Sequence, residues 1–232
     1  MFHLASSLYT QYTKREQYNV LILGLDNAGK TTFLEHLKLL YASPDSSKKP
    51  KRSKDTASII KSKRILPTVG QNTTTIKYES SSDSHLNYNN INLKFWDLGG
   101  QKSLRNMWSR YFTSCHGIIF IIDSTDTERF QECYETLVNL THDENWGSAN
   151  NDYDNMVNVP ILMMANKQDL PQAIDLVTLK TGVFIQLVSE LEATDSKLLP
   201  VSVLENQGLQ ESLEWLVTRL VYNKPNRAPE YK

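Results

Sequence analysis

The sequence contains little cysteine, no long hydrophobic run and almost no net charge. Cys115 and Cys133 are the only two cysteines among its 232 residues, too few for a disulfide framework, so two reduced thiols are expected. The 25 Lys and Arg residues nearly cancel the 26 Asp and Glu residues, which gives no overall electrostatic argument for a nucleic-acid partner. The longest apolar run, 117–122, has the length of a strand and falls short of the roughly 18 residues needed to span a bilayer.

The N-terminus also lacks the pattern of a secretory leader, in which a basic start precedes an apolar stretch and a small-residue cleavage site. We therefore expect a cytoplasmic chain that at most docks onto a membrane as a peripheral protein. Its length suits one α/β domain with some additional sequence, and no internal repeat is visible.

Short apolar runs alternate with stretches of helical periodicity along the chain. Strands are expected at 20–23, 73–78, 93–96, 117–123, 161–165 and 199–203. Helices are expected at 29–41, from a capping box at 125–128 to residue 140, at 184–191 and at 209–222. This alternation predicts an α/β fold in which a mostly parallel central sheet carries helices on both faces.

Three polar segments interrupt the alternation. Residues 43–64 are rich in Lys and Ser, 80–90 in Ser and Asn, and 143–158 in Asn and Asp, so all three are expected to be loops that are partly disordered. The chain then divides into an N-terminal amphipathic helix (1–16), one domain (17–224) that contains these inserts, and a C-terminal tail (225–232). The apolar residues near one face of the expected N-terminal helix are Phe2, Ala5, Leu8, Tyr9 and Tyr12.

The segment GLDNAGKT at 24–31 lies between an expected strand and an expected helix and has the G-x-x-x-x-G-K-[ST] spacing of a phosphate loop. Its glycines let the backbone curl so that successive N–H groups point at phosphate oxygens, and the helix that follows presents its positive end to the same anion. Lys30 adds a cation at the β and γ phosphates, and the hydroxyl of Thr31 is placed to bind magnesium. The carboxylate of Asp26 is costly near phosphates unless it is paired. The candidate phosphate-binding residues are Gly24, Asp26, Asn27, Ala28, Gly29, Lys30, Thr31 and Thr32, with Gly99 and Gly100 from a later motif.

The tetrapeptide NKQD at 166–169 follows an expected buried strand and suits guanine. The carboxylate of Asp169 can accept hydrogen bonds from the ring N1–H and the exocyclic amine of guanine, a pattern that adenine does not offer. The stem of Lys167 can pack over the base, and Asn166 can tie this loop to the phosphate loop. At Ser202 and Val203, after the last expected strand, a backbone N–H can contact the guanine oxygen. These residues argue for GTP and against an ATPase or a nucleoside kinase.

The segment DLGGQ at 97–101 follows another expected strand. Asp97 can hold a magnesium-bound water, Gly99 or Gly100 can donate an N–H to a γ phosphate, and Gln101 can orient the attacking water for in-line hydrolysis. Thr68, in PTVG at 67–70, can reach the same magnesium ion through its hydroxyl. Two hypotheses remain open: a regulatory GTP hydrolase, which Gln101 and Thr68 favour, and a nucleotide-locked binding module with negligible turnover.

Together these motifs resemble the Arf branch of the Ras-like small GTPases. GLDNAGKTT, WDLGGQ, NKQD and PTVG have the wording of that branch. Within it, the Met-Phe start, LILGLDNAGKTTFLE, SCHGIIFIIDSTD and GLQESLEWL are most similar to the ADP-ribosylation-factor-related proteins, which include fungal Arf-like GTPases of the trans-Golgi.

The resemblance implies a GDP/GTP switch that uses Mg²⁺ and acts in Golgi vesicle and membrane trafficking, as a peripheral protein of the cytoplasm and the trans-Golgi network. Its implied partners are an exchange factor, a GTPase-activating protein, a Golgi membrane receptor and effectors or downstream GTPases, with no nucleic acid and a monomeric chain. It also implies that nucleotide exchange shifts the register of the strands at 73–78 and 93–96 and releases the N-terminal helix.

Four departures from the Arf pattern limit this transfer. Phe2 stands where Arf proteins have a myristoylated glycine, so N-myristoylation is excluded. The resemblance to the ADP-ribosylation-factor-related branch instead implies an N-terminus that is acetylated and held by a Golgi membrane protein. Gln71 replaces an aromatic residue, which leaves Trp96 and Tyr111 in the predicted effector patch and puts the usual coat effectors in doubt. Val203 replaces a smaller alanine, and the insert before Pro67 is longer than Arf proteins normally have.

Two features carry alternative interpretations. The N-terminal helix can pack on the domain or act as a membrane or receptor anchor, and in this family the two are successive states of one element. The basic insert can be an anionic-lipid patch or a solvated loop. Its cations are Lys48, Lys49, Lys51, Arg52, Lys54, Lys61, Lys63 and Arg64.

Overall fold

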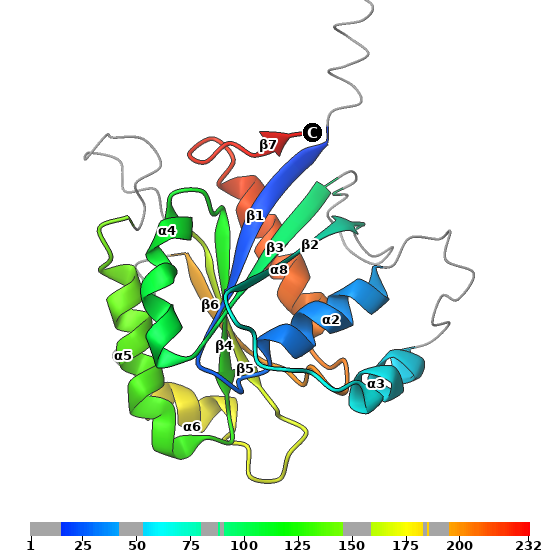
Figure 1. The fold of residues 1–232 in the computed structure, drawn as a ribbon, viewed down its shortest axis with the longest axis vertical. Helices are drawn as coiled ribbons and strands as arrows, with labels where there is room; N and C mark the ends of the chain where they lie inside the picture. Colours follow the sequence, from blue (N-terminus) through cyan, green and yellow to red (C-terminus); the bar gives the residue numbers. More distant parts are fainter. Residues whose placement is uncertain are drawn as a thin grey trace, which may run out of the picture.

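A seven-stranded sheet forms the centre of the molecule in the computed structural model, which describes residues 15–41, 53–79, 88, 91–145, 159–182, 185 and 195–232. Its strands are β1 (Glu16–Leu23), β2 (Gln71–Tyr78), β3 (Ile91–Leu98), β4 (Gly117–Asp123), β5 (Ile161–Asn166), β6 (Ser196–Pro200) and β7 (Glu230–Tyr231). The spatial order is β2-β3-β1-β4-β5-β6, and β7 pairs with β1 (Figure 1). Neighbouring strands are parallel except β2 with β3 and β7 with β1, which confirms the predicted mostly parallel sheet.

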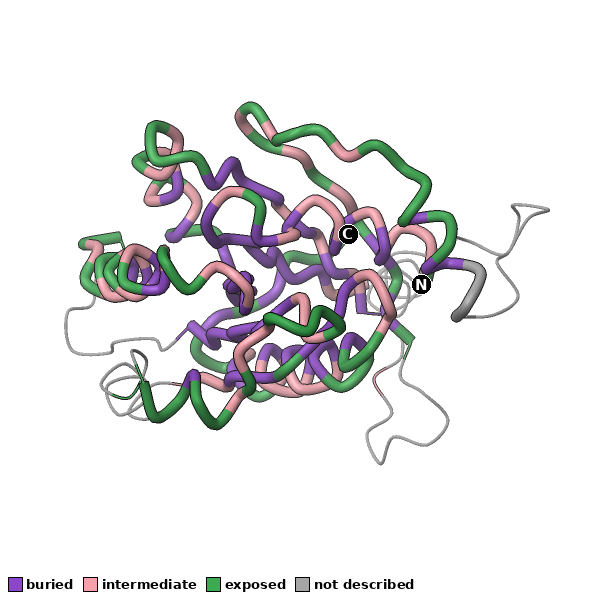
Figure 2. The backbone as a smooth tube through the Cα atoms, turned by 90° about the horizontal axis from the view of Figure 1, so that it is seen from below, coloured by how far each residue is buried: buried purple, intermediate pink, exposed green. Residues whose placement is uncertain are grey.

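Helices cover both faces of this sheet (Figure 1). On one face, α2 (Lys30–Leu40) and α8 (Leu209–Tyr222) contribute Phe33, Leu37 and Leu216 to a buried cluster. On the other, α4 (Ser109–Phe112), α5 (Phe130–Thr141) and α6 (Leu176–Thr181) contribute residues such as Leu137 and Leu179 to a second cluster. Alternate residues of β4 belong to each cluster because successive side chains of a strand point to opposite faces. Figure 2 shows the buried residues in the middle and the exposed ones outside.

The parallel strands bring several loops to one edge of the sheet. β1 pairs with β3 from Glu16 opposite Ile91 to Ile22 opposite Asp97, and β4, β5 and β6 continue in the same direction. The loops after the carboxyl ends of these strands therefore lie together, which is where open α/β sheets bind ligands.

The insert 43–64 contains a helix, so its prediction as a loop is wrong for residues 53–62. This helix, α3 (Ser53–Ser62), buries Ala57 and Ile60, whose spacing of three residues places them on one helical face. The loop was predicted from the high content of Lys and Ser, and in such a polar segment the narrow apolar face was not recognised. The rest of the insert before Ser53 lies outside the described residues.

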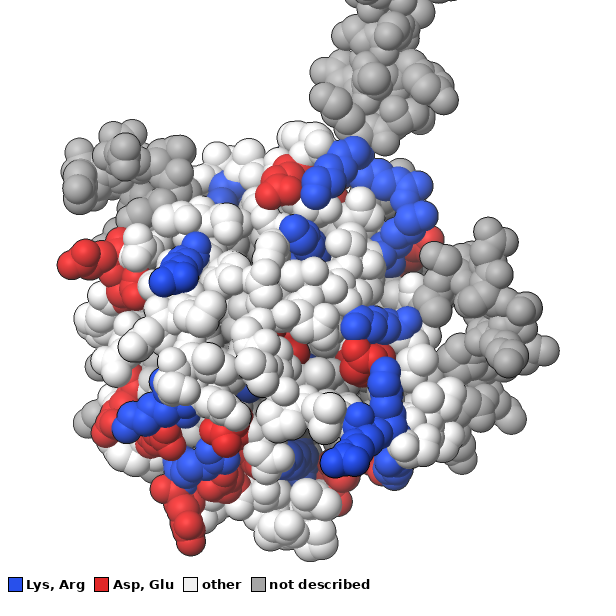
Figure 3. Space-filling model, viewed as in Figure 1, with Lys and Arg blue, Asp and Glu red and all other residues white. Residues whose placement is uncertain are grey.

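Two cations of the insert that the structure describes are paired within the chain. Lys61 forms an ion pair with Glu205, and Lys63 pairs with Glu35 on α2. On the face drawn in Figure 3, Lys and Arg side chains lie interspersed with Asp and Glu side chains. These two ion pairs partly neutralise Lys61 and Lys63. The side chains of most other cations of the insert lie outside the described residues, so the lipid patch and the solvated loop both stay predictions.

Two further predictions differ from the structure. The helix expected from a capping box at 125–128 begins instead as a 3₁₀ turn, η2 (Thr127–Arg129), before α5. The hydroxyl of Thr125 donates to Asp123 Oδ1 at 2.7 Å, so the strand-end carboxylate binds the residue that was expected to cap the helix. The last parallel strand spans 196–200 rather than 199–203, because Ser202 pairs with Gln207 in an isolated bridge that turns the chain back.

The C-terminal tail is part of the fold rather than an appendage. β7 extends the sheet beside the start of β1, and the backbones of Arg15 and Lys232 exchange hydrogen bonds of 2.8 and 3.1 Å.

Several predicted segments lie outside the described residues. The strand β1 already begins at Glu16, and the rest of the expected N-terminal helix (1–14) is not described. The same holds for residues 80–87, 89–90 and 146–158 and for most of the helix expected at 184–191. No helix in the described part of the chain is long and apolar enough to cross a membrane.

Candidate functional site

A cleft of ≈ 350 Å³ lies among the loops that follow β1, β3, β5 and β6. The predicted site residues on its walls are Asp26, Asn27, Gly29, Lys30, Thr31, Thr32, Thr68, Gly100, Gln101, Asn166, Lys167, Asp169 and Val203. Residues 65–67, Leu170 and Leu204 complete the walls. Segments that are far apart in the sequence are thus brought to one cleft, as the motif positions predicted.

The loop between β1 and α2 has the backbone of a phosphate cradle. Gly24, Asn27 and Gly29 have positive φ angles of 135°, 63° and 101°. Residues other than glycine rarely adopt such backbone conformations. A Cβ on Gly24 would lie 2.2 Å from the carbonyl oxygen of Ile121, and one on Gly29 would lie 2.4 Å from Asn166 Nδ2. Both glycines are therefore required by close contacts as well as by backbone conformation, and the N-terminal end of α2 faces the cleft.

Lys30 is buried at the base of this cleft. Its Nζ donates to the carbonyl oxygens of Gly24 at 3.0 Å and Leu25 at 2.6 Å. Burial lowers the pKa of this ammonium group to about 8, while the carboxylates of Asp97 and Asp26 oppose the shift. An anion bound in the cleft would stabilise the charged form of Lys30 further, which suits a phosphate ligand.

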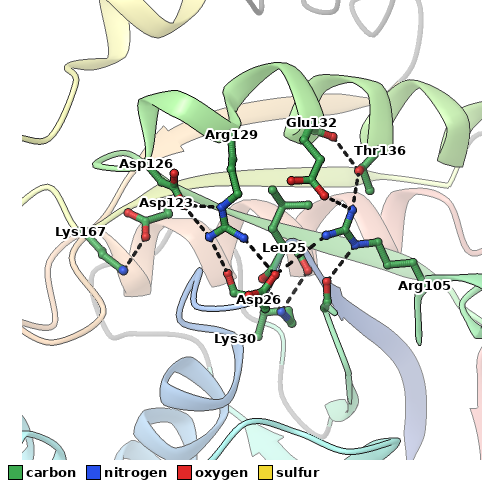
Figure 4. Close-up of polar contacts among 12 residues, drawn as sticks. Leu25, Asp26, Lys30, Arg105, Asp123, Asp126, Arg129, Glu132, Thr136 and Lys167 are labelled. Carbon is green, nitrogen blue, oxygen red and sulfur yellow. Dashed lines mark hydrogen bonds and ion pairs between the residues drawn. The ribbon is translucent and has the colours of Figure 1, made fainter. Parts of the chain in front are cut away.

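The negative charge of Asp26 is balanced by two arginines (Figure 4). Arg129 Nη1 lies 3.0 Å from Asp26 Oδ1, and its Nη2 donates to the carbonyl oxygen of Asp26 at 3.2 Å. Arg129 also pairs with Asp126 at 2.5 Å, and Arg105 Nη2 lies 4.0 Å from Asp26 Oδ1. The side chain of Asp26 thus has the partner that its position near phosphates demands.

Three oxygen-bearing side chains meet where magnesium was predicted. Thr31 Oγ1 lies 2.7 Å from Thr68 Oγ1 and donates to Asp97 Oδ2 at 2.8 Å, while Thr68 Oγ1 lies 3.1 Å from the same carboxylate oxygen. Asp97 Oδ1 is buried without a hydrogen-bond partner among the described residues, and burial raises the pKa of this carboxyl group. Two hydroxyls and a carboxylate are hard oxygen ligands, so this set fits Mg²⁺ with additional water and phosphate ligands.

The guanine motif lies at the other end of the cleft. Asn166 Nδ2 donates to the carbonyl oxygen of Ala28 at 2.8 Å, and its Oδ1 accepts from the N–H of Val203 at 3.0 Å. The side chain of Asn166 therefore joins the phosphate loop to the last loop. The Ser202 hydroxyl donates to Asp169 Oδ1 at 2.6 Å, which orients the carboxylate that was assigned to the base.

The segment 98–101 approaches the phosphate loop closely. A Cβ on Gly100 would lie 2.3 Å from Lys30 Nζ and 2.5 Å from the carbonyl oxygen of Gly24, so only glycine fits there. The N–H of Gly99 donates to the carbonyl oxygen of Gly70 at 3.0 Å. Gln101 is exposed and immediately precedes the 3₁₀ helix η1 (Lys102–Met107).

The three predicted effector residues lie together outside the cleft. The rings of Trp96 and Tyr111 are 5.5 Å apart, and the hydroxyl of Tyr111 donates a hydrogen bond to Gln71 Oε1. Lys94 Nζ lies 4.1 Å from the centre of the Trp96 ring. Gln71 thus takes part in this patch through a polar contact, at the position that the sequence analysis marked as a departure from the aromatic residue of the Arf pattern.

Three polar residues beside the cleft were not predicted. Asp123, at the end of β4, accepts from Lys167 Nζ at 2.5 Å and so fixes the lysine whose stem was assigned to the base. Arg105 and Arg129 flank the phosphate loop, although they belong to no recognised motif. The position of Asp123 at a strand end was a usable signal, and Arg129 follows Asp126 by three residues, but nothing in the sequence indicated that either arginine reaches Asp26.

Comparison with known proteins assigns the chain to a family. A family model described as the ADP-ribosylation factor family matches residues 4–49 and 58–220. The chain belongs to the ADP-ribosylation factor family. It is 44% identical over 232 residues to ADP-ribosylation factor-like protein 3 of Saccharomyces cerevisiae, with 100% of both chains covered. It is 34% identical over 223 residues to ADP-ribosylation factor-related protein 1 of Homo sapiens, covering 96% of this chain and 94% of that protein.

A solved structure shares the fold. The Arl6 BBS3 small GTPase from Trypanosoma brucei, determined with a bound nucleotide analogue GppNp, has a TM-score of 0.66 and 22% sequence identity over 89% of this chain and 99% of that chain. The chain is therefore an Arf-like small GTPase with the Ras-like fold, a member of a family of GTP-binding switches that hydrolyse GTP. The predicted family, fold and enzyme class are confirmed. Residues 50–57, which fall outside the family match, lie within the basic insert.

Proposed function

We propose that this Arf-like GTPase uses Mg²⁺ and the residues of the cleft to cycle between GDP and GTP as a switch in Golgi membrane traffic. The observation that carries the nucleotide part is the position of Asn166. Its side chain joins Ala28 of the phosphate loop to Val203 of the last loop, so that phosphate and base sites have a fixed separation. A nucleotide that spans both ends of the cleft satisfies this arrangement.

The phosphate end provides positive charge and hard oxygen ligands. Lys30 and the N–H groups of 26–32 would bind the β and γ phosphates, with the N–H of Gly100 at the γ phosphate. Thr31, Thr68 and a water on Asp97 would hold Mg²⁺, which neutralises phosphate charge when bound.

Gln101 is the residue placed to orient a water molecule on the γ phosphorus. The water oxygen forms a bond to phosphorus as the bond to the oxygen bridging to the β phosphate breaks, and GDP and inorganic phosphate result. At the base end, Asp169 would accept hydrogen bonds from guanine while Ser202 holds its carboxylate.

The nucleotide assignment is tested by Asp169→Asn, with Glu128→Gln, an exposed carboxylate outside the cleft, as the matched control. A carboxamide cannot accept from both guanine donors, but its NH₂ can donate to the 2-oxo group of xanthine. We expect GTP affinity to fall by about 100-fold or more and XTP to bind better than GTP. Unchanged GTP affinity, or wild-type binding of ATP that GTP cannot displace, would contradict the assignment.

The proposed hydrolysis of GTP is tested by a single-turnover experiment. The release of phosphate is measured from the GTP-loaded wild-type chain and from the GTP-loaded variant Gln101→Leu. We expect slow release by the wild type and release that is about 10-fold or more slower in the variant, because the water loses its orienting group. A wild-type chain that keeps GTP intact would leave the nucleotide-locked binding module as the better hypothesis.

The Golgi assignment is supported by the sequence identity to ADP-ribosylation factor-like and factor-related proteins and by the apolar positions in the first fourteen residues. We propose a monomer that moves between the cytoplasm and the Golgi membrane as a peripheral protein. An exchange factor and a GTPase-activating protein would set its state, and a Golgi membrane receptor would bind its acetylated N-terminus. Gln71, Trp96 and Tyr111 would contact effectors, through a patch more polar than three aromatic rings would form.

A further inference from the structure

Three successive peptide units leading to Gln101 are each held by one hydrogen bond. The N–H of Gly99 donates to the carbonyl oxygen of Gly70 at 3.0 Å. The indole Nε1 of buried Trp108 donates to the carbonyl oxygen of Gly99 at 3.1 Å, and Arg105 Nε donates to the carbonyl oxygen of Gly100 at 2.8 Å. Two of these donors come from the segment that follows Gln101: Arg105 lies on η1, and Trp108 lies at the end of η1.

The hydrogen bonds from Trp108 and Arg105 fix the orientation of two peptide groups near the expected γ-phosphate position. A peptide unit is planar, so a donor on a carbonyl oxygen also sets the direction of the N–H of the next residue. Trp108 thereby orients the N–H of Gly100, the group assigned to the γ phosphate. Arg105 orients the peptide from Gly100 to Gln101 and so determines where the side chain of Gln101 begins.

Arg105 is itself fixed to a helix that does not line the cleft (Figure 4). Its Nη1 lies 2.9 Å from Glu132 Oε1 and 3.3 Å from Thr136 Oγ1, both on α5. The hydroxyl of Thr136 donates to the carbonyl oxygen of Glu132 at 2.7 Å, which holds this anchor together. Only 13% of the Arg105 side chain is exposed. A guanidinium with separate donors in a rigid fork can bind Gly100 and α5 at once, which a lysine cannot do.

We infer that Arg105 is a positioning residue for GTP hydrolysis, which fixes the peptide between Gly100 and Gln101 against α5 so that Gln101 is preorganised toward the attacking water. This inference rests on the proposed role of Gln101. Arg105 acts through that residue, since it lies behind the segment 98–101 and is not among the cleft-lining residues. Loss of Arg105 should therefore affect hydrolysis much more than binding.

The test compares single-turnover hydrolysis with nucleotide dissociation in the full-length chain loaded with GTP and Mg²⁺. In Arg105→Ala we expect phosphate release to slow by about tenfold, because a misplaced group costs one to two orders of magnitude in rate. The dissociation rate of a non-hydrolysable GTP analogue should change by less than about twofold, since no bond from Arg105 to nucleotide is removed and Asp26, 4.0 Å from Arg105, keeps its closer pairing with Arg129 at 3.0 Å. Arg110→Ala, an exposed arginine on α4 five residues later, is the matched control and should leave both rates unchanged.

Two milder variants keep the test informative if Arg105→Ala does not fold. Glu132→Gln and Thr136→Val leave the bond from Arg105 to Gly100 in place and weaken only its anchor, so each should slow hydrolysis by about two- to threefold. Hydrolysis within twofold of wild type in Arg105→Ala, or in both milder variants when the first does not fold, would overturn the inference. So would equal losses of hydrolysis and analogue binding, which indicate a role in nucleotide affinity.

The proposed role of Gln101 can fail independently. If Gln101→Leu hydrolyses GTP at the wild-type rate, the assignment of Gln101 is wrong whatever Arg105→Ala shows. If Gln101→Leu is slow and Arg105→Ala is not, the assignment of Gln101 stands and the inference about Arg105 alone is rejected.

Discussion

At the scale of single residues, His116 shows how burial outside the cleft determines a chemical state. The N–H of Asn19 donates to His116 Nδ1 at 3.0 Å, and His116 Nε2 lies 3.0 Å from the carbonyl oxygen of Ala228. The neutral ring with its proton on Nε2 satisfies both contacts, whereas a doubly protonated ring loses the first. Burial lowers the pKa of His116, and the positive charge of Arg227 adds to that effect.

This state predicts a loss of stability in mild acid. Between the lowered pKa of folded His116 and its ordinary value of 6.5, the unfolded chain binds more protons, so the free energy of unfolding rises with pH across that window. Acidification from pH 7.5 to 5.5 should therefore lower the urea midpoint. His116→Asn cannot titrate and should be less stable at pH 7.5, by about 1–3 kcal/mol for the lost buried contacts, but should show a smaller pH slope.

As the control, His142→Asn makes the same substitution at an exposed residue at the end of α5. Part of the slope should survive in His116→Asn, since burial lowers the pKa of His36 as well. Equal slopes in wild type and His116→Asn, measured by urea unfolding with GDP and Mg²⁺ present, would show that His116 does not titrate as argued.

Residues within the motifs could be placed from the sequence because each motif follows a strand and the strands are parallel. Lys30, Asp97 and Asn166 each stand in a motif that follows an expected strand, and in the parallel sheet the loops that carry them lie at one edge, around the cleft. Arg105 could not be placed, because its role depends on distances to Gly100 and to α5 that no local pattern encodes. Contacts of this kind arise from packing between elements that are distant in the sequence.

At the scale of elements, the polar composition of the insert gave a wrong prediction, because a short apolar face is sufficient for a helix that packs on the domain. α3 was expected to be a loop because Lys and Ser dominate the insert, yet Thr56, Ala57 and Ile60 are buried. Helices of ten residues are marginal in water on their own, so the packing of the buried face stabilises this one, together with the ion pair from Lys61 to Glu205. β7 was missed for a similar reason, since two exposed residues carry no strand pattern before they meet β1.

The position of α3 predicts an effect on nucleotide retention. Residues 65–68, which follow α3 closely, line one wall of the cleft, and Leu204, the neighbour of Glu205, lines another. Ile60→Asp should detach α3, because it places a charge at a buried site where an isoleucine contributes about 1.5–3 kcal/mol. We expect faster cleavage within residues 50–64 by a protease and faster release of a fluorescent GDP by a few-fold.

The adjacent residue provides a matched control for this element. Ile59 is 42% exposed whereas Ile60 is 2% exposed, so Ile59→Asp introduces the same charge in the same helix without disturbing its buried face. Both measurements should remain close to wild type in Ile59→Asp. Equal protease sensitivity and GDP release in the two variants would show that α3 does not depend on its buried face and does not support the wall of the cleft.

At the scale of the whole molecule, the nucleotide cleft and the C-terminal end of the chain lie at opposite ends of β1. The cleft adjoins the loop after Leu23, while Arg15 lies before the first residue of β1 and exchanges backbone hydrogen bonds with Lys232. The buried guanidinium of Arg227 donates to the carbonyl oxygens of Phe112 and Thr113, both at 2.7 Å, which fastens the tail near that end. The residue through which 2–14 join the domain, Arg15, therefore lies away from the cleft.

This separation leads to a prediction about the membrane. Deleting residues 2–14 should release the protein from Golgi membranes while GTP and GDP binding stay unchanged, as measured by fluorescence microscopy in cells and by the nucleotide content of the purified protein. The matched control is a variant in which Ala replaces Ser6, Ser7, Thr10 and Gln11. This variant keeps the apolar positions and should remain Golgi-bound.

One short helix without a lipid binds bilayers only marginally, so the purified chain should pellet weakly with liposomes. Protease treatment of Golgi membranes should abolish binding, because it removes the proposed receptor. A deletion variant that stays on the Golgi would contradict the proposed anchor.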